Sequence, residues 1–248
     1  MYIHVSPTDV QLGQAAAEKI AQLLNQAIAE RGEANYLVST GASQFTTFEA
    51  LLKLDVDWSK VTMFHLDEYV GLPVEHIASF QKYLRERFTD KVSLKRAVFV
   101  NGLGNVEENL RLLSEDIAAH PIDVGVIGIG ENAHIAFNDP PANFETESAY
   151  HIVTLNDTCK RQQVGEGWFA TVDDVPKQAV SMTCKQIMRC HHIVAPVPNL
   201  RKAQAIHDTL CATGIDPMVP ATLMVTHPSC YLFLDKDSAS LCTPEMLG

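Results

Sequence analysis

The chain has 248 residues, of which 46% are hydrophobic and 20% are charged, and its formal net charge at pH 7 is −11. This composition is ordinary for a globular protein with a sizeable core, and no change of composition marks a linker, so we expect a single domain over residues 1–248. The acidic balance argues against nucleic acid or an anionic membrane as the partner, although a local group of cations could still bind a small anion.

The strands and helices that the sequence predicts alternate along the chain. We expect strands over residues 2–5, 36–38, 61–66, 98–100, 122–129, 150–155, 179–182, 192–197 and 231–234. We expect helices over residues 8–30, 45–54, 76–88 and 106–119, another that starts at 198–202, and a helical turn at 220–224. Such alternation predicts an α/β fold with a doubly wound, mainly parallel sheet and helices on both faces.

Polar residues follow three of the predicted strands. Ser39, Thr40, Gly41, Ala42 and Ser43 lie between the strand at 36–38 and a helix, and Asp67 and Glu68 follow the strand at 61–66. The third group is Glu131, Asn132, His134, Asn138 and Asp139, just after the apolar run at 122–129. A parallel sheet places the carboxyl ends of its strands along one edge, so we expect the three groups to share a cleft.

Each group has a structural and a functional interpretation. The 39–43 segment is either a plain strand–helix turn or a phosphate cradle at a helix N-terminus, and Asp67 is either a helix cap or a general base. His134 is either a hydrogen-bonded loop residue or a catalytic one. Four cations at loop-to-helix transitions could bind an anion: Lys160, Arg161, Arg201 and Lys202. Together the groups suit proton transfer on a phosphorylated sugar.

Two segments carry a resemblance to a known family. FHLDEYVGLP at 64–73 resembles the MDEYVGL signature of glucosamine-6-phosphate deaminases (isomerases), and GIGENAHIAFNDP at 128–140 resembles their GIGxxGHIAFNEP motif. The resemblance spans nearly the whole chain in order. It implies a modified Rossmann-like fold and the conversion of glucosamine 6-phosphate and water to fructose 6-phosphate and ammonia, with no metal and no organic cofactor.

The resemblance also implies roles for individual residues. Asp67 matches the base that moves a proton between C2 and C1, His134 matches the base of ring opening, and Asn132 and Asp139 match two positions that assist it. The 40–43 segment matches the phosphate loop. Lys202 matches the phosphate-binding lysine, and Lys160 and Arg161 are both candidates for the phosphate-binding arginine.

Departures from the family pattern leave the exact amino sugar open. The phosphate loop reads STGASQ where PTGSTP is usual, Ala133 replaces a glycine that would matter at a positive φ, and Asp139 is shorter than the usual Glu. No counterpart of the tail used by allosteric members is evident, so we expect no allosteric regulation. A 6-phosphogluconolactonase-type hydrolase and a non-catalytic sugar-phosphate sensor are the alternatives, and the Asp-Glu-Tyr triplet favours the deaminase.

Cellular location, metal binding and assembly have weaker signals. No stretch reaches the roughly 18 apolar residues of a membrane span, and MYIHVSPTDV lacks the regions of a signal peptide. The six cysteines are scattered without a CxxC pair, which is typical of a reduced, cytoplasmic chain. Cys190, His191 and His192 are adjacent on a strand and make a poor metal chelate. Monomer and homo-oligomer remain open.

Overall fold

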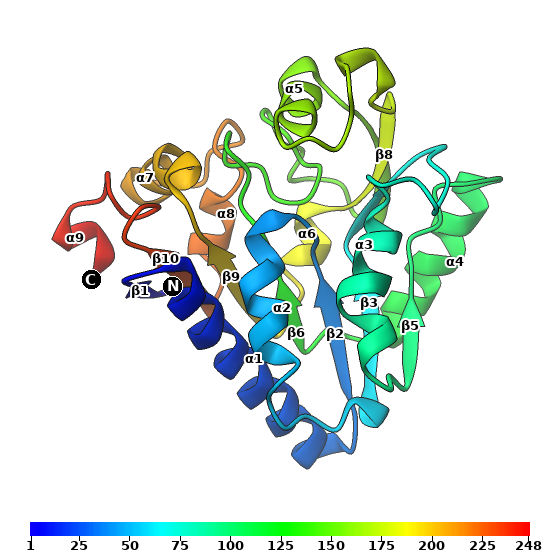
Figure 1. The fold of residues 1–248 in the computed structure, drawn as a ribbon, viewed down its shortest axis with the longest axis horizontal. Helices are drawn as coiled ribbons and strands as arrows, with labels where there is room; N and C mark the ends of the chain where they lie inside the picture. Colours follow the sequence, from blue (N-terminus) through cyan, green and yellow to red (C-terminus); the bar gives the residue numbers. More distant parts are fainter.

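The structure, a computed structural model, describes residues 1–248 and confirms the predicted α/β fold (Figure 1). Its centre is a seven-stranded sheet with the order β1-β10-β9-β6-β2-β3-β5, in which every neighbouring pair is parallel. In that order the strands are β1 (Tyr2–Ser6), β10 (Cys230–Asp235), β9 (His192–Val197), β6 (Val124–Val126), β2 (Ala34–Val38), β3 (Val61–His65) and β5 (Arg96–Val98).

Helices cover both faces of this sheet. One apolar core joins it to α1 (Asp9–Arg31), α2 (Phe45–Leu51) and α3 (Phe80–Arg87). The other joins it to α4 (Val106–Ala119), α6 (Cys184–Ile187), α7 (Ala203–Cys211) and α8 (Thr222–Val225). Because successive side chains of a strand point to opposite faces, Tyr36 and Val38 belong to the first core and Leu37 to the second.

A second, smaller sheet stands beside the carboxyl ends of the main strands. It consists of β4 (Asp67–Tyr69), β8 (Gln178–Met182) and β7 (Tyr150–Thr154), all antiparallel. The predicted strands at 150–155 and 179–182 therefore pair with each other, and the second of them also pairs with Asp67–Tyr69. Next to this sheet, α5 (Asp157–Gly165) packs on a separate small core that includes Tyr69, Phe137, Cys159 and Phe169.

Several predicted boundaries shift for local reasons. The strand expected at 122–129 pairs only over Val124–Val126, because the chain turns away at Gly128 toward the polar loop. The helix expected from 76 begins at Phe80, where the Ser79 side chain accepts a hydrogen bond from the Lys82 backbone N–H and caps the helix. The remaining short helices are η1 (Ala42–Gln44), η2 (Trp58–Lys60), η3 (Thr89–Lys91), η4 (Val172–Asp174), η5 (Leu200–Lys202) and α9 (Pro244–Leu247).

None of the helices combines the length and the apolar character that crossing a membrane requires.

Candidate active site

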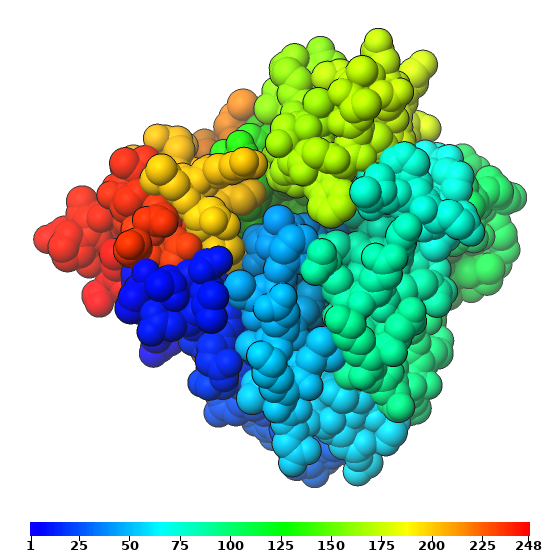
Figure 2. All heavy atoms as spheres, viewed as in Figure 1, coloured from blue at the N-terminus to red at the C-terminus, as the bar shows by residue number.

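A cleft of about 790 Å³ opens at the carboxyl ends of four adjacent strands, β9, β6, β2 and β3. The segments that follow these strands line it, together with parts of α3 and α5. Figure 2 shows the yellow-green segment around α5 standing over α2 and α3 on this face of the molecule. A parallel sheet binds ligands at this edge because its strand ends and loops converge there.

Asp67 and Glu68 lie on opposite faces of β4 and have different surroundings. Asp67 is 6% exposed, lines the cleft, and makes no hydrogen bond through its carboxylate to any protein group. Glu68 accepts hydrogen bonds from three backbone N–H groups, those of Tyr69, Phe80 and Gln81, and from Ser79 Oγ. Glu68 therefore holds the start of α3, and Asp67 is the carboxylate that is free to react.

Burial makes the Asp67 carboxylate more basic than an exposed one. Loss of hydration, followed by the nearby charge of Glu68, raises the pKa of Asp67 well above its ordinary value. Burial also raises the pKa of Glu68, and its four hydrogen bonds oppose that rise. A carboxylate with a raised pKa is a better proton acceptor than an ordinary one at neutral pH.

His134 stands in the same cleft, oriented by two neighbours. Its Nδ1 lies 2.5 Å from Asn132 Oδ1 and 3.3 Å from Asp139 Oδ1, and Asn132 Nδ2 donates to the same Asp139 oxygen at 2.9 Å. Both neighbours of Nδ1 are acceptors, so Nδ1 carries the proton and Nε2, which has no protein partner, is the basic nitrogen. Burial opposes the ionisation of Asp139, but its interactions with His134, Asn132 and Cys159 together outweigh burial and lower the pKa of Asp139.

The backbone of this loop is tightly constrained. A Cβ atom on Gly130 would lie 2.1 Å from His134 Cε1, so only glycine leaves room for the imidazole ring. Ala133 has a φ of 62°, in the left-handed region where glycine is favoured. The departure from the family glycine therefore falls at a position that does need a positive φ. The loop adopts this conformation with alanine, at a cost of about 1–2 kcal/mol.

The 39–43 segment forms one wall of the cleft. All five of its residues line the cleft, and Gly41 has a φ of 104°, which glycine adopts readily. The hydroxyl of Tyr83, on α3, donates to the carbonyl of Gly41 at 2.8 Å and fixes the segment to its neighbour. Ser39 Oγ is buried without a hydrogen-bond partner, which leaves its donor available to a ligand.

Three cations line the cleft, and only two of them were among the candidates from the sequence. Lys202 is partly buried, burial lowers its pKa, and no carboxylate lies within 4 Å of its ammonium group. Arg201 is 3.9 Å from Glu131 in an exposed pair. The sequence interpretation missed Arg87 of α3, whose guanidinium lies 3.8 Å from the centre of the Phe45 ring and has no carboxylate partner.

Lys160 and Arg161 do not line the cleft, so the structure gives neither of them support as a phosphate ligand. The segment from α5 instead contributes two amides, a carboxylate and an indole: Gln162, Gln163, Glu166 and Trp168. The sequence interpretation noted this stretch only as polar. A usable signal was the spacing of Cys159, Gln162, Gln163 and Glu166, which places all four on one side of a helix.

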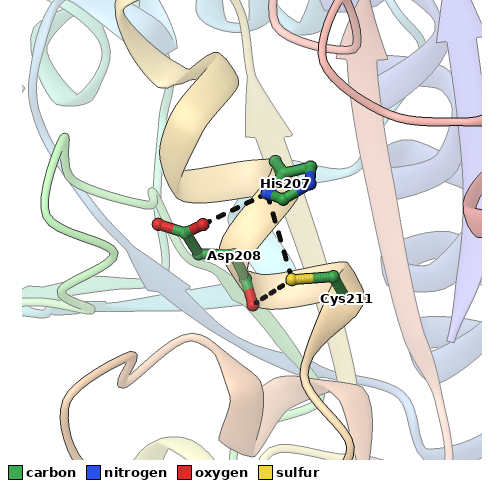
Figure 3. A group of neighbouring side chains, drawn as sticks. All are labelled: His207, Asp208 and Cys211. Carbon is green, nitrogen blue, oxygen red and sulfur yellow. Dashed lines mark hydrogen bonds and ion pairs between the residues drawn. The ribbon is translucent and has the colours of Figure 1, made fainter.

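Candidate metal ligands lie outside the cleft. His207, Asp208 and Cys211 group on α7, where His207 Nδ1 is 3.2 Å from Asp208 Oδ1 and 3.9 Å from Cys211 Sγ (Figure 3). All three come from one helix and satisfy one another. His191 and His192 diverge, the first toward Asp123 at 3.2 Å and the second toward Ser229 Oγ at 2.6 Å, as expected of adjacent strand residues.

A parallel α/β sheet with a free carboxylate, an oriented imidazole and unpaired cations at one edge defines a protein that acts on a small anionic substrate. The family model described as glucosamine-6-phosphate isomerases/6-phosphogluconolactonase matches residues 7–232. The chain belongs to this family.

Similar proteins of known name support the assignment of the chain to this family. The chain is 34% identical over 229 residues to a glucosamine-6-phosphate deaminase of Streptococcus equi subsp. zooepidemicus, and 35% identical over 229 residues to one of Listeria monocytogenes. Each match covers 92% of this chain and 95% of the relative.

Solved structures agree in fold. One described as a monomeric glucosamine-6-phosphate deaminase matches with a TM-score of 0.89 and 27% identity, covering 97% of this chain and 100% of that chain. A 6-phosphogluconolactonase from Shewanella baltica has a TM-score of 0.76 and 21% identity, covering 95% and 97% of the two chains, which shows the shared fold alone.

Proposed function

We propose that this protein is an amino-sugar-phosphate deaminase that converts glucosamine 6-phosphate and water to fructose 6-phosphate and ammonia. The observation that carries the proposal is the pairing, in one cleft, of the unpartnered carboxylate of Asp67 with the free Nε2 of His134. Conversion of a cyclic aldose to a ketose needs one base for ring opening and a second base that moves a proton from C2 to C1. The family and the deaminase names of its relatives support the same reaction.

The phosphate binds at the 39–43 wall in this proposal. The free hydroxyl of Ser39, the glycine turn at Gly41 and the unpaired ammonium of Lys202 are groups that suit a phosphate. Arg87 adds a second unpaired cation beside Phe45, and aromatic packing holds its guanidinium in place. Lys160 and Arg161 have no part in the proposed phosphate site.

The chemistry then proceeds by proton transfers. His134 Nε2 takes the proton of the C1 hydroxyl and returns it to the ring oxygen as the C1–O5 bond breaks, while Asn132 and Asp139 hold Nδ1–H. Asp67 removes the proton from C2 and delivers it to C1, and a proton passes from the amino nitrogen to the C1 oxygen, which gives a ketose imine at C2 and a hydroxyl group at C1. Water adds to the imine carbon, the C–N bond breaks, and ammonia leaves. His134 and Asp67 carry the ring-opening proton and the C2 proton, and the proposal includes no metal and no organic cofactor.

We propose further that residues 1–248 act as one catalytic domain in the cytoplasm, in the breakdown of amino sugars such as those derived from N-acetylglucosamine. The sugar phosphate is the only partner in this proposal, with no nucleic acid and no membrane surface, and both monomer and homo-oligomer are compatible with it. The net charge of −11 supports the exclusion of polyanionic partners.

Ammonia release tests the reaction class. The assay compares glucosamine 6-phosphate, galactosamine 6-phosphate and mannosamine 6-phosphate, with 6-phosphogluconolactone as the fourth substrate. Ammonia from at least one amino sugar supports the proposal. Hydrolysis of the lactone alone would make the protein a lactonase, and binding without turnover would make it a sensor.

Asp67→Asn tests the proton transfer. The amide keeps the shape of the side chain but removes the base, and loss of a general base typically lowers rates by about 10²- to 10⁴-fold. We expect a fall of that size in both ammonia release and deuterium exchange at C2 in heavy water, with sugar-phosphate binding retained. Wild-type exchange in this variant would assign the base to another residue.

A further inference from the structure

The α5 wall of the cleft contains a carboxylate that the proposed reaction does not use. Glu166 lines the cleft together with Gln162 and Trp168, and it follows directly after the last residue of α5. No cation from this segment lines the cleft. A negative charge there repels a phosphate, so the phosphate is not the group that this part of the wall is suited to bind.

Two side chains hold the Glu166 carboxylate in one orientation. Gln162 Nε2 donates to Oε1 at 2.8 Å, and Trp168 Nε1 donates to Oε2 at 3.1 Å. An ionised carboxylate has about four acceptor sites, so each oxygen keeps one free. No lysine, arginine or histidine lies within 4 Å of the carboxylate. Glu166 is therefore a fixed, unpaired acceptor that can receive hydrogen bonds from a ligand in the cleft.

Glu166 lies near both ends of the proposed substrate site. At one end, burial lowers the pKa of Lys202 and the charge of Glu166 opposes that change. At the other end, burial and the adjacent Asp139 raise the pKa of Cys159, and the charge of Glu166 adds to the rise. Glu166 therefore lines the same cleft as Lys202, His134 and Asp67 and is within electrostatic range of Lys202 and of the catalytic cluster.

We propose that Glu166 accepts hydrogen bonds from the hydroxyl groups in the middle of the sugar, at C3 and C4, and thereby selects the configuration at C4. This inference rests on the proposed function for the orientation of the sugar, with its phosphate at Lys202 and its C1–C2 end at Asp67. The C4 hydroxyl of the gluco and galacto epimers points in opposite directions, so a fixed acceptor reaches it in only one of them. Loss of that contact leaves a partly buried charge without a hydrogen-bond donor from the sugar, which is a basis for discrimination.

The test compares C4 epimers in the wild type and in Glu166→Gln and Glu166→Ala. We expect the wild type to prefer one of glucosamine 6-phosphate and galactosamine 6-phosphate. In Glu166→Ala, kcat/KM for the preferred epimer should fall about 10- to 100-fold, as expected for a hydrogen bond to a charged group, and for the other by less than about 3-fold. Glu166→Gln should give a smaller change in the same direction.

Two further variants separate recognition of the sugar from the structure of the α5 wall. Trp168→Phe keeps an aromatic ring but loses the Nε1–H donor that orients Glu166, so it should narrow the epimer ratio without abolishing activity. Asp173→Asn is the matched control, because Asp173 is an acidic residue of η4 on the same segment that does not line the cleft. It should leave the ratio unchanged.

Equal losses for both epimers in Glu166→Ala, or no preference in the wild type, would overturn the inference. Binding measured by calorimetry with fructose 6-phosphate and tagatose 6-phosphate, which are C4 epimers, keeps the two proposals distinguishable. If no ammonia is released from any amino sugar, the proposed reaction fails, and the ratio of the two ketose affinities in the wild type and in Glu166→Ala still decides the role of Glu166.

Discussion

Acidification should destabilise the protein through His65, the last residue of β3. Its ring is fully buried and packs edge-on against Phe99, with 6.0 Å between ring centres. Neither ring nitrogen has a hydrogen-bond partner. Burial therefore lowers the pKa of His65 from 6.5 to about 3, because the charged ring would lose its hydration without gaining a partner.

The sign and size of the effect follow from these two pKa values. As pH falls below about 6.5, the unfolded chain takes up a proton at this position, whereas the folded protein does so only near pH 3. The unfolded state binds more protons in this window, so the free energy of unfolding falls as pH falls. Between pH 7 and pH 5 the loss should be about 2 kcal/mol, and it should approach about 5 kcal/mol below pH 3.

Urea unfolding at pH 7 and pH 5 measures this loss in the wild type and in His65→Leu. Leucine does not titrate, so the variant should lose about 2 kcal/mol less than the wild type between the two pH values, whatever its stability at pH 7. His4→Leu is the matched control, because His4 also lies beside a phenylalanine ring, that of Phe233 at 5.7 Å, but is exposed. Identical pH dependence in His65→Leu and the wild type would refute the reasoning and mean that water or a partner reaches the ring.

Four further predictions concern the cleft. Lys202→Ala should raise KM for the sugar phosphate at least tenfold with a smaller change in kcat, because it removes binding energy rather than a reacting group. Arg87→Gln should also raise KM, whereas Arg85→Gln, on the same helix but outside the cleft, should not, and equal KM values in both variants would remove Arg87 from the phosphate site. His134→Gln should lower kcat/KM about 10²- to 10⁴-fold in steady-state assays of the cyclic sugar. Ala133→Gly should raise the free energy of unfolding by about 0.5–1 kcal/mol, since relief of left-handed strain exceeds the added chain entropy, and a lower Tm would contradict this.

The sequence predicted those site residues whose position follows from a neighbouring strand a few residues away. Asp67 and His134 each follow a strand of a parallel sheet by a few residues, so the rule that strand ends share an edge was enough to expect them in one cleft. The contrast between Asp67 and Glu68 also follows from alternation on β4. The sequence did not predict that β4 joins β8 in an antiparallel sheet, because pairing between residues more than a hundred positions apart leaves no local pattern.

The cations depend on tertiary structure and were predicted less well. Arg87 enters the cleft because its guanidinium packs on Phe45, which belongs to another helix, and no spacing in the sequence signals that contact. Lys160 and Arg161 were attractive because they lie near a helix start. A helix turns about 100° per residue, however, so burial of Cys159 and Gln163 places Lys160 on the flank of α5 and Arg161 on its opposite side.

The proposed substrate is an anion, yet the chain as a whole is acidic and the cleft contains the carboxylate of Glu166. The charges of the remaining surface are screened over about 8–10 Å in physiological salt, so the net charge of −11 has little influence inside the cleft. Inside the cleft, binding depends on the nearby charged groups. Lys202 and Arg87 have no carboxylate partner, and two hydrogen-bond donors fix the orientation of the Glu166 carboxylate. A substrate with an anion at one end and hydroxyl donors in the middle satisfies both kinds of group at once. A bare phosphate satisfies only the first, which is why recognition of the sugar and recognition of its phosphate should be separable by mutation.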